Sequence, residues 1–257
     1  MEEDLATGGL FADPDGFYPP TPPPRPVSYA FDNGQELTLY LVGQPSLEAN
    51  HLWNGARVVS KLFERDPSLV RGRTVLELGA GAGLPSLVCG ALECKRAVLT
   101  DYPDVDIVQN LQTNVDLLEE AVTAAKGRVR VKGYVWGADV APLLGELDGG
   151  EEGFDVLVLA DLLFRHSEHG NMVKSIAKTL KKTRGSVAYV VFTSYRPWLK
   201  EKDLEFFDVA RVKGFVVEKI LEEKLEKPLF ENDPGDLEVQ KTVTGWTVRW
   251  PEEALEA

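Results

Sequence analysis

The stretch "TVLELGAGAGLP", Thr74 to Pro85, decides the fold, because a short apolar run is followed at once by three glycines within five positions. A glycine-rich turn between a strand and a helix lets a ligand approach the backbone closely, and the helix that follows directs free N–H groups toward it. Turns of this kind hold adenine dinucleotides, nucleoside triphosphates or S-adenosylmethionine. The neighbouring residues have to distinguish among these ligands.

Three features in and beyond the turn narrow the choice among these three ligands. A triphosphate-binding loop requires Lys and then Ser or Thr after its last glycine, and Leu84 and Pro85 stand there instead. Asp101, at the end of the next apolar run, suits the ribose hydroxyls of either remaining ligand. Glu77, just ahead of the turn, would repel a pyrophosphate and suits a ligand that carries positive charge. The turn therefore favours S-adenosylmethionine and leaves a dinucleotide open, since the glycine spacing comes close to the dinucleotide fingerprint.

Strand-like and helix-like segments alternate along the chain, which is typical of a parallel sheet covered on both faces. We expect strands at 73–79, 96–101, 128–136, 154–161 and 185–195. We expect helices at 46–64, 84–93, 104–125, 167–182 and 200–214. Two final strand-like runs, 215–225 and 241–250, have an acidic loop and no helix between them, so they must pair antiparallel. The prediction is a doubly wound, Rossmann-like α/β sheet of seven strands with a C-terminal antiparallel hairpin, preceded by one extra strand at 35–42.

The bulk composition bounds the class of protein. A chain of 257 residues with 44% hydrophobic and 27% charged residues fits one globular α/β domain. The net charge of −13 argues against a nucleic-acid partner, whose phosphates require a basic face. No apolar run reaches the roughly 18 residues that span a bilayer, and the N-terminal residues are acidic where a targeting segment would be basic. We expect a cytoplasmic monomer that binds neither nucleic acid nor membrane.

Proline and cysteine usage adds two expectations. Residues 1–26 are proline-rich and are predicted to form an arm outside any sheet, while residues 27–257 form the folded domain. The arm carries three aromatic residues that suit docking on that domain, namely Phe11, Phe17 and Tyr18.

Cys89 and Cys94 lie five apart in one expected helix and are predicted to be buried thiols rather than disulfide partners or zinc ligands.

Four stretches of the chain share their order and spacing with one enzyme family. They are "LWNGARVVSKLF" (52–63), "VLELGAGAGLPSLVCGALECKRAVLTDYPD" (75–104), "YVWG" (134–137) and "DVLVLADLLFRHSEHGNMVKSI" (155–176). Together they resemble the lysine-methyltransferase-like group often called family 16. The signature of that group, an acid followed three residues later by Tyr or Phe, corresponds to Asp161-Leu-Leu-Phe164.

The shorter motifs "TDYPD", "RHSEH" and "LFADPDGFYPP" are similar to a fungal branch of this family that methylates translation elongation factor 1-alpha at its N-terminal glycine and an adjacent lysine. The resemblance implies a class I protein N-methyltransferase with S-adenosylmethionine as cofactor, S-adenosylhomocysteine as product and elongation factor 1-alpha as protein partner. Three alternatives stay open. They are small-molecule methylation of the nicotinamide type, which older descriptions gave to this branch, lysine methylation on another protein, and a binding module without catalysis.

The resemblance also implies which residues form the site. Cofactor binding falls to residues at strand ends or in segments able to fold over them, namely Trp53, Glu77, Gly79, Ala80, Gly81, Asp101, Trp136 and Ala160. The catalytic positions are Asp161, Phe164 and Tyr102. Methyl transfer to an amine mainly requires alignment and desolvation, so a carboxylate can orient the amine while aromatic faces tolerate its methylated, cationic forms. Two plainer roles are possible: Asp161 could cap the segment that follows it, and either tryptophan could belong to the core.

The histidine pair of "RHSEH" has several possible roles. His166 and His169 are three apart and could share a helix face, but a zinc site needs a third ligand that the sequence does not offer. We therefore expect no metal, and a general base or a structural role for these histidines.

Overall fold

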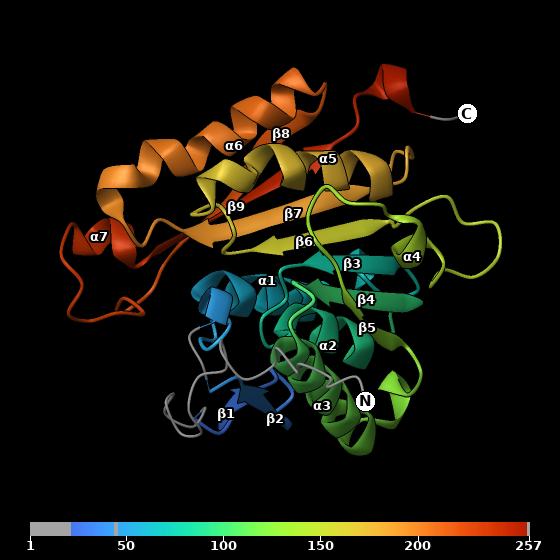
Figure 1. Cartoon of the computed structure of the whole chain (residues 1–257), viewed down its shortest axis with the longest axis horizontal. Coiled ribbons are helices and arrows are strands. Elements are labelled where there is room, and N and C mark those ends of the chain that lie inside the picture. The colour runs from blue at the N-terminus through green and yellow to red at the C-terminus, as the bar shows by residue number, and fades with distance from the viewer. Residues whose placement is uncertain (1–21, 44–45, 256–257) are drawn as a thin grey trace, which may run out of the picture.

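A seven-stranded sheet forms the centre of the computed structural model, which describes residues 22–43 and 46–255 (Figure 1). The strand order is β5-β4-β3-β6-β7-β9-β8, with parallel pairing from β5 to β7 and antiparallel pairing of β9 to both of its neighbours. The strands are β3 (Thr74–Leu78), β4 (Arg96–Asp101), β5 (Val129–Gly133), β6 (Val156–Ala160), β7 (Val187–Thr193), β8 (Val216–Lys224) and β9 (Thr242–Arg249). This architecture confirms the fold class predicted from the sequence.

Burial explains which strands are central and which form the edge. Every residue of β3, β6 and β7 is buried, as expected for strands covered on both faces. Strand β8 is largely exposed and carries charged side chains, a composition that protects a free sheet edge from pairing with another chain. Strand β9 is better buried and lies between β7 and β8. The hairpin thus places its apolar strand inside and its charged strand outside.

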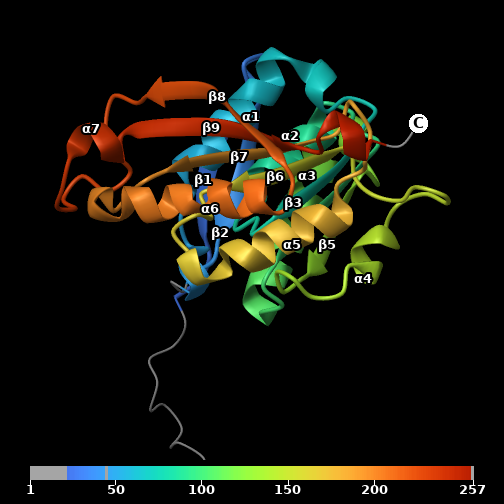
Figure 2. The ribbon, with the colours of Figure 1, turned by 90° about the horizontal axis from the view of Figure 1, so that it is seen from above.

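Helices cover both faces of the sheet. α1 and α2 pack against each other on one face, where α1 contacts β7 and α3 contacts β5, while α5 and α6 pack together on the other face (Figure 2). The α-helices are α1 (Asn54–Arg65), α2 (Leu84–Ala91), α3 (Val105–Ala121), α4 (Ala141–Leu144), α5 (His169–Thr179), α6 (Lys200–Val212) and α7 (Leu237–Gln240). Short 3-10 helices occur at Ser46–Glu48, Pro67–Leu69, Thr123–Ala125, His166–Glu168, Pro197–Leu199 and Glu252–Ala254. No helix in the described ranges is both long and apolar enough to cross a membrane.

The first helix was expected to begin at Ser46, and this expectation is wrong. The short turn Ser46–Glu48 contains positive φ angles, 55° at Leu47 and 65° at Glu48, which a right-handed helix cannot contain. The α-helix begins only at Asn54, with Trp53 at its N-cap position. Residues 46–53 therefore form an irregular segment, which we call the 46–53 segment.

A separate two-stranded sheet precedes this segment. β2 (Glu36–Leu41) confirms the extra strand, and it pairs antiparallel with β1 (Arg25–Ala30), which was not expected. Arg25 and Pro26 were assigned to an arm outside any sheet, and that assignment is wrong. Proline is tolerated here because β1 pairs on one side only. The aromatic residues of the expected arm lie outside the described residues.

Asn114 of α3 connects this small sheet to the glycine turn. Its side chain is fully buried, and its Oδ1 accepts a hydrogen bond from Tyr40 N at 2.7 Å. Its Nδ2 donates to Tyr40 O at 2.9 Å and to Ala82 O at 3.0 Å. One amide group thus holds β2 against α3 and fixes the turn between β3 and α2.

Two smaller expectations differ from the structure. The loop between β8 and β9 was expected to contain no helix, but it includes the single turn α7, where the side chain of Asp236 accepts from Glu238 N at 2.8 Å. Cys89 and Cys94 are both buried free thiols, as predicted. Cys94 lies beyond the end of α2 rather than on the same helix, since the helix ends at Ala91.

We predict that Phe63→Ala destabilises the protein by about 3 to 4 kcal/mol, because Phe63 is fully buried where α1 packs on the sheet. Its ring centroid lies 5.4 Å from that of Tyr189 on β7. Urea unfolding measures the change. The control is Val212→Ala on α6, where the side chain is 90% exposed and the expected change is within about 0.5 kcal/mol. Equal stabilities of the two variants would contradict the packing of α1.

Candidate active site

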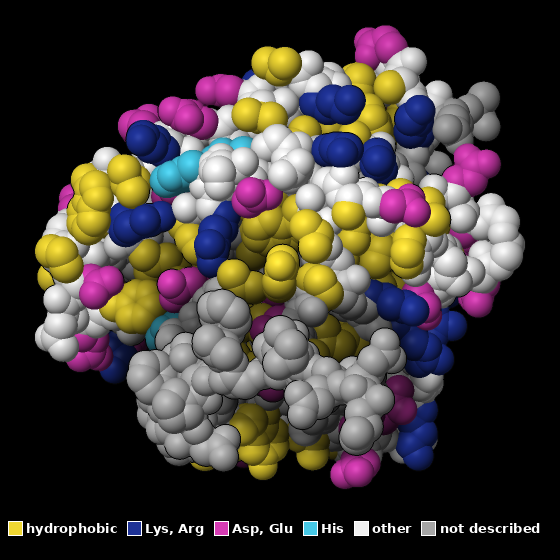
Figure 3. Space-filling view, in the orientation of Figure 1, with side chains coloured by type: hydrophobic (Ala, Val, Ile, Leu, Met, Phe, Trp, Pro, Cys, Tyr) yellow, Lys and Arg dark blue, Asp and Glu magenta, His cyan; other side chains and the backbone are white. Residues whose placement is uncertain are grey.

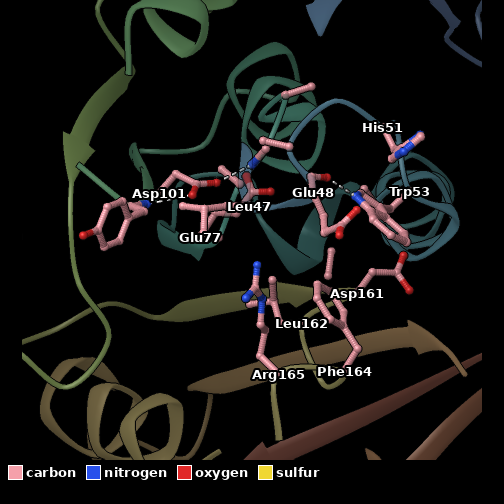
Figure 4. A pocket seen from close by; sticks show the side chains of 18 of the residues that line it. Leu47, Glu48, His51, Trp53, Glu77, Asp101, Asp161, Leu162, Phe164 and Arg165 are labelled. Atoms are coloured by element: carbon pink, nitrogen blue, oxygen red, sulfur yellow. Dashed lines mark hydrogen bonds between the residues drawn. The ribbon is translucent and has the colours of Figure 1, made fainter. Parts of the chain in front are cut away.

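A cavity of about 300 Å³ opens at the carboxyl ends of β3, β4 and β6, the place where open α/β sheets bind ligands (Figure 4). It is bounded by the 46–53 segment, the glycine turn, the residues after β5 and the loop after β6. The cavity brings together every residue that the sequence assigned to the site: Trp53, Glu77, Gly79, Ala80, Gly81, Asp101, Tyr102, Trp136, Ala160, Asp161 and Phe164.

The glycines of the turn serve different purposes. Gly79, Gly81 and Gly83 all have positive φ, at 63°, 56° and 81°. A Cβ on Gly79 would lie 2.6 Å from Leu162 Cδ2 and 3.0 Å from Trp136 Cζ2, so glycine is needed there for packing. A Cβ on Gly81 would meet nothing within 4 Å. Gly81 therefore faces open space, which is what a turn that receives a ligand requires.

Asp101 is held by the turn and remains open to the cavity. Its Oδ2 accepts from Gly81 N and its Oδ1 from Tyr102 N, both at 2.7 Å. Burial raises the pKa of this carboxyl, against the lowering effect of the two hydrogen bonds. Each carboxylate oxygen can accept a further bond, so the residue is suited to a pair of ligand hydroxyls.

Glu77 lies at the bottom of the cavity and is only 1% exposed. Its Oε2 accepts from Ser86 N at 2.9 Å, at the start of α2. Burial, with a smaller contribution from the Asp101 carboxyl, raises the pKa of Glu77 to about 8. A cationic group bound beside it would favour its ionised form, so this end of the cavity suits a positively charged ligand.

Asp161 connects three parts of the fold through its carboxylate. Its Oδ2 accepts from Gly55 N at 2.5 Å and its Oδ1 from Thr193 N at 2.8 Å. The residue is 3% exposed and has a φ of 54°, and burial raises its pKa to about 7. The N-cap residue of α1, Trp53, provides no side-chain acceptor, so the carboxylate of Asp161 supplies it. Asp161 thus caps α1, an earlier helix, rather than the segment that follows it.

Gly55 makes this contact possible. A Cβ at this position would lie 2.4 Å from Val191 O and 2.6 Å from Asp161 Oδ2. Only glycine permits the start of α1 to approach both β7 and the carboxylate.

An aromatic cluster lies at the same end of the cavity. The rings of Trp53 and Phe164 stack with centroids 5.8 Å apart, and Tyr195 meets Trp53 edge-on at 4.9 Å. His51 and Phe230 close the cluster, 5.1 Å from each other and 5.5 and 5.8 Å from Trp53. The indole Nε1 of Trp53 donates to Glu48 O at 2.9 Å, which closes the 46–53 segment on itself. Trp53 is therefore a wall of the cavity, rather than a residue of the core.

Tyr102 lines the cavity on a different side. It follows Asp101 directly, and its side chain is 52% exposed. Among the described aromatic pairs, none joins Tyr102 to the cluster around Trp53. Leu47 and Val135 are similarly exposed at the rim, and Figure 3 shows hydrophobic side chains gathered in the middle of this face.

The histidine pair lies behind the cavity wall. His166 Nε2 is 2.7 Å from Asp203 Oδ1 on α6, and the buried His169 bonds Leu163 O at 2.7 Å. Both interactions hold the loop after β6 against the helices. Within the described ranges, no three His, Cys, Asp or Glu residues are grouped so as to hold a metal ion.

The sequence did not identify the remaining lining residues. They are Leu47, Glu48, Ala49, His51, Leu52, Ala56, Ala82, Leu84, Tyr134, Val135, Leu162, Arg165 and Glu168. Five of them directly adjoin a residue that was identified, so for these proximity in sequence was an available signal: Leu52, Ala82, Val135, Leu162 and Arg165. Tyr195 and Phe230 offered no such signal, because Tyr195 lies two residues after β7 and Phe230 lies in the loop between β8 and β9, both far along the chain from Trp53.

The topology and the site together define a class of protein: a sheet of this order, with a glycine turn after β3 and an acid at the end of β4, is the fold of class I S-adenosylmethionine-dependent methyltransferases. Solved structures agree. A Pyrococcus horikoshii transferase superposes with a TM-score of 0.55 at 15% identity, covering 88% of this chain and 72% of its own. P. horikoshii TYW2, solved in complex with MeSAdo, gives 0.54 at 16% identity with the same coverage.

The family follows from sequence comparison. A family model described as lysine methyltransferase matches residues 35–212, and the chain belongs to this family. The protein N-terminal and lysine N-methyltransferase efm7 of Neurospora crassa is 59% identical over 96% of this chain and 90% of its own. The proteins of the same name from Gibberella zeae and Schizosaccharomyces pombe are 57% and 41% identical, covering 98% and 97% of this chain and 98% of their own length in each case. The membership confirms the enzyme class expected from the sequence, a protein N-methyltransferase, and decides against the dinucleotide alternative.

We predict that the raised pKa of Glu77 makes stability depend on pH. Between its ordinary value of 4.5 and about 8, the native state binds a proton that the unfolded chain does not, so this contribution to stability falls as pH rises through that window. Without ligand, the free energy of unfolding of the unmodified protein should fall by roughly 4 kcal/mol more than that of Glu77→Gln between pH 5 and 8.5, since one proton over about three pH units is worth this much. Urea unfolding at both pH values measures this, and identical pH dependence in the two proteins would contradict it.

We predict that Asp161→Asn destabilises the start of α1. An amide can accept from only one of the two backbone N–H groups, so a buried donor at Gly55 or Thr193 is left unpaired at a cost of about 1 to 3 kcal/mol. Hydrogen exchange at these two amides should become faster. The matched control is Asp104→Asn at the N-cap of α3, where asparagine caps as well as aspartate and no comparable loss is expected.

Proposed function

We propose that this chain transfers methyl groups from S-adenosylmethionine to the N-terminal glycine amine and an adjacent lysine of translation elongation factor 1-alpha. The observation that carries the proposal is the identity of 59% and 57%, over nearly the whole chain, to proteins named for methylation of protein N-termini and lysines. The choice of elongation factor 1-alpha rests on the motifs "TDYPD", "RHSEH" and "LFADPDGFYPP". The cytoplasmic location and the monomeric state expected from the sequence belong to the same proposal.

The residues of the cavity fit the cofactor. Asp101 would accept the ribose hydroxyls, and Gly81 leaves space for the backbone to approach the methionyl part. Glu77 would face the positive charge, in keeping with the raised pKa of its carboxyl in the absence of a cation. When bound, the cofactor supplies a methyl group activated by the sulfonium, so the protein has only to present the amine.

The aromatic cluster supports an amine substrate. Trp53 and Phe164 are stacked beside the buried carboxyl of Asp161, so a cation that enters here meets ring faces. Such faces attract ammonium groups whether or not they carry methyl groups, because the attraction acts through the ring quadrupole. An amine can then be methylated more than once at the same place. Both oxygens of the Asp161 carboxylate already accept backbone N–H groups. Asp161 therefore contributes by holding the start of α1, and with it Trp53, in place rather than by offering a free carboxylate to the amine.

We predict that the protein methylates a peptide copying the N-terminus of elongation factor 1-alpha and leaves nicotinamide unmodified. The assay uses labelled S-adenosylmethionine with either acceptor, and tandem mass spectrometry locates the methyl groups on the peptide. Label on nicotinamide alone would overturn the proposal. Label at the lysine only, on a peptide whose N-terminal amine is free, would restrict the proposal to lysine.

Two tryptophan variants, one in the cavity wall and one on the surface, provide an internal control. Trp53→Ala should lower kcat/KM for the peptide roughly tenfold or more, because the wall that aligns the amine is lost. Trp198→Ala should have little effect, since Trp198 is 61% exposed and does not line the cavity.

A further inference from the structure

Arg165 stands out because it is the only Lys or Arg among the described residues that line the cavity, and the other charged side chains there are carboxyl groups. The acids that line the same space are Glu48, Glu77, Asp101, Asp161 and Glu168. In Figure 4 the side chain of Arg165 rises from the loop after β6 with its guanidinium directed into the cavity. The chain as a whole has 41 acidic and 28 basic residues, so a cation at this place is not explained by composition.

The backbone holds Arg165 in a fixed position. Its N–H donates to Leu162 O at 3.1 Å, and its carbonyl accepts from Glu168 N at 2.9 Å. The preceding carbonyl, Phe164 O, accepts from the guanidinium of Arg196 at 3.0 Å. The guanidinium of Arg165 itself lies over the Phe164 ring, 5.4 Å from its centroid, which restrains the side chain next to the aromatic cluster.

The carboxyl groups of four of these five acids, all except Glu48, have other partners. Asp161 and Asp101 each accept two backbone N–H groups, and Glu77 accepts Ser86 N. Glu168 Oε2 accepts from Asn171 Nδ2 at 2.9 Å. The ion pairs formed within the described residues join other cations to their acids, as Lys181 does with Asp155 at 2.9 Å. In the described part of the chain, the guanidinium fork of Arg165 is left to face the cavity.

We propose that Arg165 forms a carboxylate-binding subsite within the cavity. A guanidinium presents two parallel N–H groups that match a carboxylate, and this geometry is stronger and more specific than a single charge. If the proposed function holds, two molecules can provide the carboxylate. One is the methionyl end of the cofactor, and the other is an acidic side chain of the substrate protein.

The test compares ligands that differ only in the carboxylate. Calorimetry measures the affinity of the unmodified protein and of Arg165→Met for S-adenosylhomocysteine and for the same thioether without its carboxyl group. If the cofactor provides the carboxylate, Arg165→Met weakens binding of S-adenosylhomocysteine at least tenfold and leaves the decarboxylated analogue nearly unchanged. Arg165→Lys should give an intermediate loss, because it keeps the charge without the fork.

The second arm uses peptides that begin with glycine and lysine and continue with either glutamate or glutamine. If the substrate provides the carboxylate, Arg165→Met leaves both thioether affinities unchanged and raises KM for the glutamate peptide several-fold, with kcat retained. The variant should then no longer distinguish the two peptides.

Arg184→Met serves as the control, because Arg184 is 82% exposed and pairs with Glu252 on the surface. Unchanged affinities together with unchanged KM values in both Arg165 variants would overturn the subsite. The calorimetric arm needs no protein substrate, so a failure of the proposed substrate does not affect its outcome.

Discussion

The carboxylate of Asp161 is the interaction on which the arrangement of the site depends. It accepts the N–H groups of Gly55 and Thr193, and so joins the end of β6 to the start of α1 and the end of β7. Trp53 directly precedes that helix, and its ring stacks on Phe164, three residues after Asp161. A single buried acceptor therefore sets the distance between the two aromatic walls of the cavity.

Burial of acids around one cavity costs stability. Glu77, Asp101 and Asp161 all have raised pKa values, and burial is the largest cause for each of them. A cation inside the cavity would reverse part of this cost, because it favours the ionised forms. The site therefore reduces the stability of the protein most when it is empty, and a bound ligand with positive charge restores more of that stability than a neutral one. This relation between stability and ligand charge is expected where a site is built for binding rather than for folding.

Much of this arrangement could be predicted from the sequence, and the exceptions share a physical cause. The buried strands, the glycine turn and the positions of Asp101 and Asp161 follow from local patterns, since each strand end leads to the same edge of the sheet. The 46–53 segment could not be predicted, because its helical spacing is interrupted by positive φ angles at Leu47 and Glu48. Phe230 reaches Trp53 only through the tertiary fold. Long-range contacts of this kind leave no periodic signal in the chain.

The position of β9 between β7 and β8 has a consequence for the order of folding. β9 follows the other six strands of this sheet along the chain, yet it lies between β7 and β8. It pairs with residues 188–193 of β7 and with Val216–Lys224 of β8. Until it emerges from the ribosome, the hydrogen-bonding edge of β7 has no partner, and an unpaired edge of a buried strand is prone to aggregation. The nascent chain consequently depends on Thr242–Arg249 to complete the sheet, and termination before this strand would expose β7, the strand against which α1 packs.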